Sequence, residues 1–460
     1  MTNGASPFLL GHGRPASPLA GRAASNGSIV RSLSQLDGGR ARRRHRAHGG
    51  IAVRRLIAAT ATSSLGDGLV VVAFPLLALR LTSSPLLVSG VAAATRLPWL
   101  VIGLPAGAVV DRIDRKRLVA VVDLLRATVV ALVALAVGLG RAQLAMLYVA
   151  AFLLGAGETL VHSAARSVIP LAAADESLAR ANAQYNAARV ATVQFGGPAL
   201  GGLLFGALRA LPFAGDALSY VGSAGLLRSA LAQAEQTPKG KARAAARPAA
   251  ATRLRADLAD GLATFGRSAP LRSLAAAISS FAFCQAIVLG ILVVYGSRVL
   301  HLSPAGYGLF LALGAVGDLL GSAAAPRVHG RLGAYATLVA AAFAAAGGYL
   351  LLSAAGDRLV AVVGLAVEAV ATSVGNVAST TARFRLIPAE RFGVVNNAYR
   401  MVVLGVGPVG ALLGGALATS IGLRPTMAAA GIVQVAALAA VALPLRSIRA
   451  APTPEPALEA

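Results

Sequence analysis

Long apolar runs recur along the whole chain, and they constrain its fold more than any other feature. Each run is about 20 residues long, which is the length a helix needs to cross the hydrocarbon layer of a bilayer. They begin near Leu56, Leu86, Leu118, Leu144, Tyr185, Phe213, Leu274, Tyr307, Ala334, Leu359, Val394 and Thr426. Hydrophobic residues make up 56% of the sequence and charged residues only 13%, so a water-soluble domain is excluded. The pattern predicts an all-α membrane protein of about 12 transmembrane helices.

Composition favours helices that pack closely through small residues. The chain has 51 glycines and only 5% aromatic residues, and Gly and Ala let helix backbones approach each other in lipid. The single cysteine, Cys284, lies in an apolar run. It excludes a disulfide framework and a cysteine-based metal site, and we interpret it as a buried thiol. We expect no metal and no cofactor.

The net charge of +24 is distributed in a way that points to a membrane rather than to nucleic acid. Positive residues crowd one set of connections: the tail before Leu56, 112–117, 228–272 and the segments around Arg327, Arg383 and Arg446. The alternate connections carry about one arginine each, at Arg80, Arg141, Arg209, Arg298, Arg358 and Arg424. This alternation is the positive-inside pattern, which predicts that both termini are cytoplasmic in a plasma (inner) membrane protein.

The runs divide the chain into two halves. We expect a disordered basic tail over 1–50, a six-helix half over 51–232, a cytoplasmic linker with an amphipathic segment over 233–267, a second six-helix half over 268–447 and a short tail over 448–460. The composition of the first fifty residues, rich in Gly, Ser, Pro and Arg, lacks an apolar core. Arg54-Arg55 resembles a twin-arginine signal, but the run that follows is long enough to be an uncleaved first helix.

The two halves repeat at an offset of 218 or 219 residues. Asp67 lies 13 positions before Arg80, and Gln285 lies 13 before Arg298; Glu158 lies 12 before Pro170, as Asn376 lies 12 before Pro388. Pro85 and Pro304 each precede an arginine by 27 positions. Parallel six-helix repeats of this kind place a substrate site near the bilayer midplane, between the halves.

Two motifs then carry a family resemblance. The string GAVVDRIDRKR, from Gly107 to Arg117, resembles the signature between the second and third helices of the major facilitator superfamily, with Asp114 where the family has glycine. GGPALGG, from Gly196 to Gly202, resembles the end of the fifth-helix motif of proton-driven exporters. The strings DGLATFGRSAPLR and RLPWLVIGLPAGAVVDR resemble the branch with macrolide-efflux proteins and the enterobactin exporter. The resemblance covers about 400 residues from Arg54 onward.

The resemblance implies a gate motif formed by Gly107, Asp111, Arg112 and Arg115. Asp111 would dock on the positive N-terminal end of the eleventh helix, near Gly393, when the cytoplasmic side is closed. A solvated charged turn would have the same sequence. In the fifth helix, Gly197 and Pro198, with Gly201 and Gly202, are expected to allow close packing and a bend, with ordinary small-residue packing as the alternative.

Charged residues at membrane depth are candidates for proton coupling, because an unpaired charge there costs several kcal/mol. Asp67 lies about 16 Å into the first helix and Arg96 at a similar depth in the second, so we expect an ion pair that a proton or substrate breaks, or a static structural pair. Glu158 and His162 share one face of the fourth helix, forming a proton route or a satisfied polar stripe. Glu368 and Asp318 are second-rank candidates.

The third helix and the cavity complete the expectations. Asp123 and Arg126 are expected to pair with each other and to support the nearby turn, with no transport role. The family's cavity is lined by the first, fourth, seventh and tenth helices, and the resemblance therefore implies Phe74, Gln285, Tyr295 and Asn376 as cavity residues. Aromatic and amide groups with few charges suit an apolar or amphiphilic substrate.

These observations predict a secondary active transporter, not an enzyme, that exports a hydrophobic or amphiphilic small molecule (a drug, siderophore or secondary metabolite) in exchange for protons. An importer of a small nutrient on the same fold is the first alternative, and a membrane-embedded protein without transport activity is the second. No HExxH or GxxxxGK[ST] motif is present, so ATP hydrolysis and metalloprotease chemistry have no support. The expected partners are the substrate, the lipid bilayer and a proton gradient, with sodium as the open alternative, and we expect a monomer.

Overall fold

The computed structural model describes residues 20–101, 113–166, 168–169, 178–235, 254–388 and 391–446, and within these ranges the chain folds into helices without strands. The first half contains α1 (Ala20–Leu81), α2 (Pro85–Val101), α4 (Arg115–Gly138), α5 (Leu144–Arg166), α7 (Leu178–Val190), the π-helix η2 (Ala191–Gly196), α8 (Gly197–Ala207) and α9 (Leu211–Glu235). After α11 (Leu254–Arg267), the second half contains α12 (Ala269–Arg298), α13 (Pro304–Ala354), α14 (Arg358–Leu386), α15 (Phe392–Gly405), α16 (Gly407–Ser420) and α17 (Leu423–Leu445).

The helices of the described residues are enough for the twelve membrane crossings that the sequence predicts. Nine stretches of the described residues are long and apolar enough to cross a bilayer. One of them, α13, has 51 residues and contains two crossings, because Gly333 interrupts it with a φ of 73°, a conformation that glycine adopts readily. The short α2 and α9, whose apolar face is broken by Asp216, supply the other two. The predicted fold class is confirmed.

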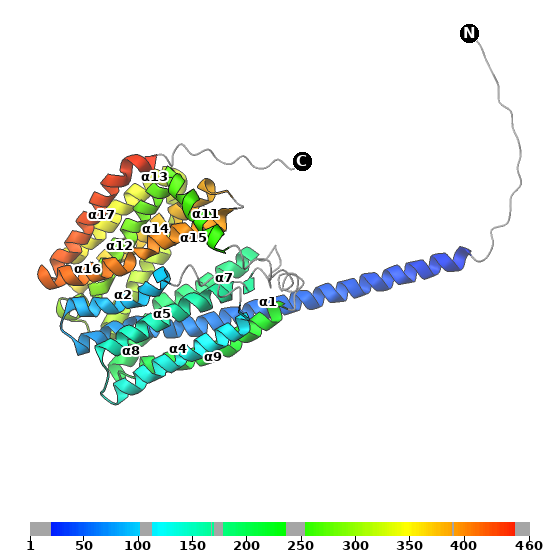
Figure 1. The fold of residues 1–460 in the computed structure, drawn as a ribbon, viewed down its shortest axis with the longest axis horizontal. Helices are drawn as coiled ribbons and strands as arrows, with labels where there is room; N and C mark the ends of the chain where they lie inside the picture. The colour runs from blue at the N-terminus through cyan, green and yellow to red at the C-terminus, as the bar shows by residue number, and fades with distance from the viewer. Residues whose placement is uncertain are drawn as a thin grey trace, which may run out of the picture.

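The two halves form separate bundles that touch at one end (Figure 1). Between the halves, α2 packs on α12 and α16, and α8 packs on α13. The contacts of Gly415 with Pro85 and of Gly202 with Pro304 lie near the loops 82–84 and 299–303, where the guanidinium of Arg298 donates a hydrogen bond to the carbonyl oxygen of Ser83. The halves are therefore sealed against each other at the loop end that follows α1 and α12.

The first helix begins earlier than we expected. Residues 20–49 continue α1 as one helix that projects from the bundle in Figure 1, in place of a disordered tail. Once the apolar part of α1 is helical, each further residue adds a hydrogen bond without a new nucleus, and the Ala and Arg residues of this stretch are good helix formers.

The linker helix α11 belongs structurally to the second half. Gly261 contacts Val394 of α15 closely, and the ring of Phe265 lies 6.4 Å from the ring of Tyr399 in an edge-on arrangement. The end of the amphipathic segment predicted in the linker therefore packs on α15.

Candidate functional site

A charged network in the first half is centred on Asp67 of α1. One carboxylate oxygen of Asp67 accepts two hydrogen bonds, from the Nη2 of Arg126 on α4 at 2.7 Å and from the hydroxyl of Tyr220 on α9 at 2.7 Å. The guanidinium carbon of Arg126 lies 4.0 Å from the centre of the Tyr220 ring, so the cation also contacts the aromatic face. Three helices are joined at this one carboxylate.

Arg126 is the buried member of the network. Its side chain is 4% exposed, whereas that of Asp67 is 21% exposed. A second carboxylate, Asp123, lies one turn away with its oxygen 3.6 Å from the Nη1 of Arg126 and is fully buried. Neither oxygen of Asp123 has a hydrogen-bond partner among the described residues. Arg126 therefore has two carboxylates within reach and is hydrogen-bonded to only one.

This geometry corrects two expectations. Asp67 pairs with Arg126 rather than with Arg96, and Arg126 does more than pair with Asp123. The reason is the helix packing: α1 and α4 both pack on α9, which brings Arg126 to Asp67 beside Tyr220, whereas α2, which carries Arg96, packs mainly on α5 and α16. Depth along each helix predicts which charges share a level, but the identity of the partner depends on which helices are neighbours.

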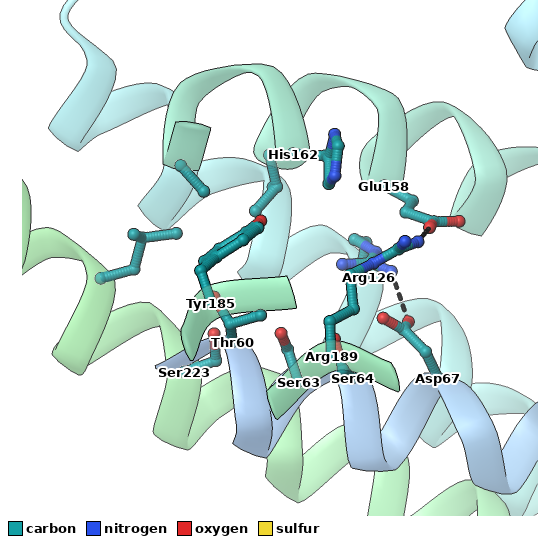
Figure 2. Close-up of a pocket in the computed structure, with 13 residues that line it drawn as sticks. Thr60, Ser63, Ser64, Asp67, Arg126, Glu158, His162, Tyr185, Arg189 and Ser223 are labelled. Atoms are coloured by element: carbon teal, nitrogen blue, oxygen red, sulfur yellow. Dashed lines mark hydrogen bonds and ion pairs between the residues drawn. The ribbon is translucent and has the colours of Figure 1, made fainter. Parts of the chain in front are cut away.

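A second ion pair lies beside the first. Arg189 of α7 donates to Glu158 of α5 at 3.2 Å, and both side chains are partly exposed. His162 lies one turn after Glu158, and its ring is 6.5 Å from that of Trp99. Figure 2 shows Arg126 and Arg189 between α1 and α5, each directed at its carboxylate. The shared face of Glu158 and His162 was predicted, and Arg189 as the partner was not.

Two cavities meet at this network. A small one of about 30 Å³ lies inside the first half and is lined by the charged groups and by the hydroxyls of Thr60, Ser63, Ser64, Tyr185 and Ser223; it has room for about two water molecules. Figure 2 shows these hydroxyls following α1 away from Asp67. A larger cavity of about 250 Å³ lies between the halves. Asp67, Arg126 and Glu158 line both cavities.

The larger cavity is mostly apolar. Val70, Val71, Phe74, Pro75, Val91, Ala92, Ala151 and Leu154 line it from the first half, and Leu289, Tyr307 and Leu311 from the second. Phe74 was predicted to line the cavity and does so, with its ring packed edge-on against Phe213 at 5.5 Å. Arg96 also faces this cavity.

A separate polar cluster lies in the second half around Glu368 of α14. One oxygen of Glu368 accepts hydrogen bonds from Gln285 at 3.2 Å, from Tyr349 at 3.3 Å and from Thr372 at 2.8 Å. All three donors are uncharged, and the cluster joins α12, α13 and α14. The sequence indicated separate roles for Glu368 and Gln285, and the structure brings them together inside the half, away from both cavities described above.

Three further candidates lie apart from the two cavities. The hydroxyl of Tyr295 donates to the carbonyl oxygen of Leu352 at 2.6 Å, and the side chain is fully buried, which corrects its expected place in the cavity. Its hydroxyl is satisfied by helix packing between α12 and α13. Asn376 is exposed and lines neither cavity. Asp318 is half-buried on α13, where its backbone carbonyl accepts from Ser373.

The fifth-helix motif lies where three helices cross. A Cβ added to Gly197 would lie 2.5 Å from the Cα of Gly68 on α1, and one added to Gly201 would lie 2.6 Å from the carbonyl oxygen of Leu69. The following glycine, Gly202, faces α13 instead. The π-helix η2 precedes the motif, and the amide of Gly197 donates to the carbonyl five residues back, because Pro198 cannot donate to the regular α-helical ladder.

Of the gate motif, Gly107, Asp111 and Arg112 lie outside the described residues, and Arg115 is buried in the first turn of α4. Asp114 is the N-cap of α4, and its carboxylate accepts hydrogen bonds from the amides of Lys116 at 2.8 Å and Arg117 at 3.5 Å. Partial burial opposes ionisation of Asp114, but these hydrogen bonds and the nearby positive charges outweigh it and lower the pKa of the carboxyl. An N-cap thus replaces the family's glycine in making the turn.

The sequence did not indicate Tyr220 and Arg189 as site residues, and it predicted for Arg126 only a pairing with Asp123. A usable signal existed for Tyr220, because Asp216, Ser219, Tyr220 and Ser223 interrupt an otherwise apolar helix. Polar residues gathered on one stretch of a membrane helix face the bundle interior rather than lipid. For the two arginines the partner depended on the tertiary arrangement.

Comparison with known proteins gives a consistent picture. A family model described as transmembrane secretion effector matches residues 50–458. The multidrug efflux pump Tap of Mycolicibacterium fortuitum is 37% identical over 161 residues, which are 33% of this chain and 38% of the relative. Tap of Mycobacterium tuberculosis strain H37Rv is 39% identical over 155 residues, covering 32% and 36% of the two chains. The matches thus span little more than a third of these relatives.

Solved structures show the same fold at low identity. A bacterial homologue of the iron transporter ferroportin in an inward-facing state has a TM-score of 0.68 at 18% identity, covering 86% of this chain and 98% of that one. A bacterial homologue of the human lysosomal transporter Spinster, inward-facing and occupied, has a TM-score of 0.66 at 16% identity, covering 87% and 98%.

Proposed function

Because the chain belongs to the transmembrane secretion effector family of the major facilitator superfamily, whose fold is that of transporters, we propose that it exports a hydrophobic or amphiphilic small molecule in exchange for protons. Export is favoured by the partial match to relatives described as multidrug efflux pumps. The proposed substrate site is the cavity of about 250 Å³ between the halves, where apolar walls meet a few polar groups.

The observation that carries the proton-coupling proposal is the shared carboxylate of Asp67. It faces the cavity, and it holds the buried Arg126 and Tyr220 by one oxygen. A proton on Asp67 removes the charge that attracts Arg126, and the fully buried Asp123 is already 3.6 Å from the same guanidinium. Arg126 then has a second carboxylate to pair with, so protonation can change how α1, α4 and α9 are joined.

The small polar cavity offers a route for that proton. Its hydroxyl groups and its space for about two water molecules lead to Asp67 and Glu158. Each hydroxyl can both donate and accept a hydrogen bond, which is what a proton relay requires. Substrate in the larger cavity and a proton from the smaller one would then reach the same carboxylates.

Orientation follows from the distribution of charge. The positive-inside pattern supports the proposal that both termini lie in the cytoplasm of a cell that carries the chain in its plasma membrane. The loops 82–84 and 299–303, where the halves are sealed, then lie on the outer side. The structure would be closed to the outside, as in an exporter ready to load from the cytoplasm or the inner leaflet.

The test is energised efflux from cells that lack their own drug pumps. Cells expressing the chain are loaded with a panel of fluorescent amphiphiles, one cationic, one neutral and one anionic, and efflux is followed with and without a protonophore. We expect protonophore-sensitive efflux of at least one probe, and a loss of about tenfold or more in Asp67→Asn, since one charge-assisted hydrogen bond is worth about 1.5–3 kcal/mol.

Asp357→Asn is the matched control. Asp357 caps α14 at the loop end of the second half by accepting from the amide of Val360 at 2.9 Å, and asparagine caps helices equally well. Efflux that is insensitive to the protonophore, or equal in wild type and Asp67→Asn, would refute proton coupling through Asp67. Energised uptake of the probes instead of efflux would favour the importer.

A further inference from the structure

We propose that Arg96 recognises an anionic group of the substrate, so that the transported class is an apolar molecule with one acidic function, such as a carboxylate, sulfonate or phosphate ester. This inference deepens the proposed function and rests on it. The sequence predicted that Arg96 pairs with Asp67, but in the structure Asp67 pairs with Arg126 instead. The role proposed here for Arg96 therefore differs from the expected one.

Arg96 differs from the other two arginines of the site in its lack of a bound partner. Arg126 pairs with Asp67 and Arg189 pairs with Glu158. Within the described part of the chain, Arg96 forms neither an ion pair nor a hydrogen bond. Glu158 interacts with it electrostatically at longer range, but that carboxylate is already bonded to Arg189. A guanidinium at membrane depth is costly without an anion or water beside it.

The surroundings of Arg96 match an acidic amphiphile. Its side chain is half-buried and faces the cavity, whose other lining residues are predominantly aliphatic and aromatic. The planar guanidinium presents paired donors that suit carboxylate, sulfonate and phosphate oxygens. An apolar substrate body would contact Phe74, Leu289 and Leu311, while the acidic group would remain at Arg96.

The position of Arg96 also connects recognition to the conformational change. The side chain lies against α16 of the second half, where a Cβ added to Gly407 would be 3.4 Å from the Cδ of Arg96. An anion bound here would therefore lie between the two halves rather than within one. A ligand shifts a conformational equilibrium only if it binds the two conformations with different affinity. An anion held between the halves would have different contacts before and after the halves move, so it would bind the two conformations with different affinity.

A pair of naphthalene probes separates charge from apolarity. Anilinonaphthalene sulfonate is anionic, and N-phenyl-1-naphthylamine is the same molecule without the sulfonate. Trp99 is the only tryptophan of the chain and lies three positions after Arg96 on α2, so energy transfer from Trp99 reports a probe bound nearby. Binding is measured with purified protein in phosphatidylcholine nanodiscs, with no proton gradient.

We expect Arg96→Gln to weaken the saturable binding of the sulfonate about tenfold or more and to leave the binding of the uncharged probe within about twofold. Arg96→Lys should retain most of the sulfonate affinity.

The control is Arg80→Gln, which removes the same charge from the exposed end of α1. An equal loss of both probes in Arg96→Gln would show a structural role and refute the proposal, as would no change in either probe or an equal loss of the sulfonate in Arg80→Gln. The assay involves no transport, so its failure leaves proton-coupled efflux standing, and absence of efflux leaves the binding result standing.

Discussion

Arg126 reaches Asp67 because the residue that it passes on α5 is a glycine. A Cβ added to Gly157 would lie 2.6 Å from the Cδ and 2.8 Å from the Cγ of Arg126. Both distances are far below normal carbon–carbon contact of about 3.5–4.0 Å. Gly157 therefore creates the space in which the stem of a long, fully buried cation is held, and it belongs to the network although it carries no polar group.

We predict that Gly157→Ala displaces the Arg126 side chain and lowers protonophore-sensitive efflux by about tenfold, the equivalent of roughly 1.4 kcal/mol, with overpacking expected to cost about 1–3 kcal/mol. The measurement is the efflux assay with expression level checked in the membrane fraction. Gly347→Ala on α13 is the control, because nothing lies within 4 Å of the added methyl. Unchanged efflux in Gly157→Ala would show that the position of Arg126 is not critical.

At the level of single residues, the sequence identified the carboxylates of the network better than it identified the residues that pair with them. Asp67 and Glu158 are visible as charges within apolar runs, and so is the cation Arg96. What a single sequence does not contain is the neighbour relationship among helices, which assigned Arg126 to Asp67, Arg189 to Glu158 and no described partner to Arg96.

Among the elements, α8 packs closely on helices of both halves. Gly197 and Gly201 contact α1, while a Cβ on Gly202 would lie 2.4 Å from the carbonyl oxygen of Pro304 on α13. The repeat in the second half has the same arrangement: a Cβ on Gly415 of α16 would lie 3.0 Å from the carbonyl oxygen of Pro85 on α2. Each half thus contributes one glycine-rich helix that contacts the first turn of a helix in the other half.

We predict that Gly202→Ala separates α8 from α13 and lowers the midpoint of thermal unfolding in nanodiscs by several degrees, since overpacking costs about 1–3 kcal/mol. Gly206→Ala, one turn later on the same helix, is the control, because its nearest contact would be an ordinary 4.0 Å to the Cβ of Pro304. Equal midpoints for the two variants would show that the crossing tolerates a methyl group. The sequence predicted close packing at this motif, but not that Gly201 and Gly202 face different halves.

For the whole molecule, the repeat observed in the sequence corresponds to a division between the halves. The first half contains the carboxylates paired with arginines, and the repeat-equivalent of Asp67 in the second half is Gln285, which donates to Glu368 within a cluster of uncharged donors. The all-helical membrane fold and this asymmetry were predictable, because hydrophobicity and internal offsets are local properties of the sequence. Which end of the molecule is sealed was not predictable, since it depends on contacts between the halves.

The hydrogen bond from Arg298 to the carbonyl oxygen of Ser83 joins the two halves at this end. The repeat-equivalent arginine of the first half does not make the corresponding bond among the described residues. Arg80 occupies the repeat-equivalent position, and within the described part of the chain it makes no hydrogen bond or ion pair. A hydrogen bond to a charged donor is worth about 1.5–3 kcal/mol, which is enough to change a two-state population about tenfold or more. Arg298 should therefore favour the state in which this end is closed.

We predict that Arg298→Ala moves the population toward the state that is open at the loop 82–84 and that Arg80→Ala does not. Leu139 and Leu359 are exposed at this end, one on each half, and accept spin labels after replacement of the buried Cys284 by alanine. Double electron–electron resonance in nanodiscs should show a larger share of long distances in Arg298→Ala than in the unsubstituted labelled protein. If both arginine variants give the same distance distribution, the glycine contacts at Gly202 and Gly415 maintain the seal without Arg298.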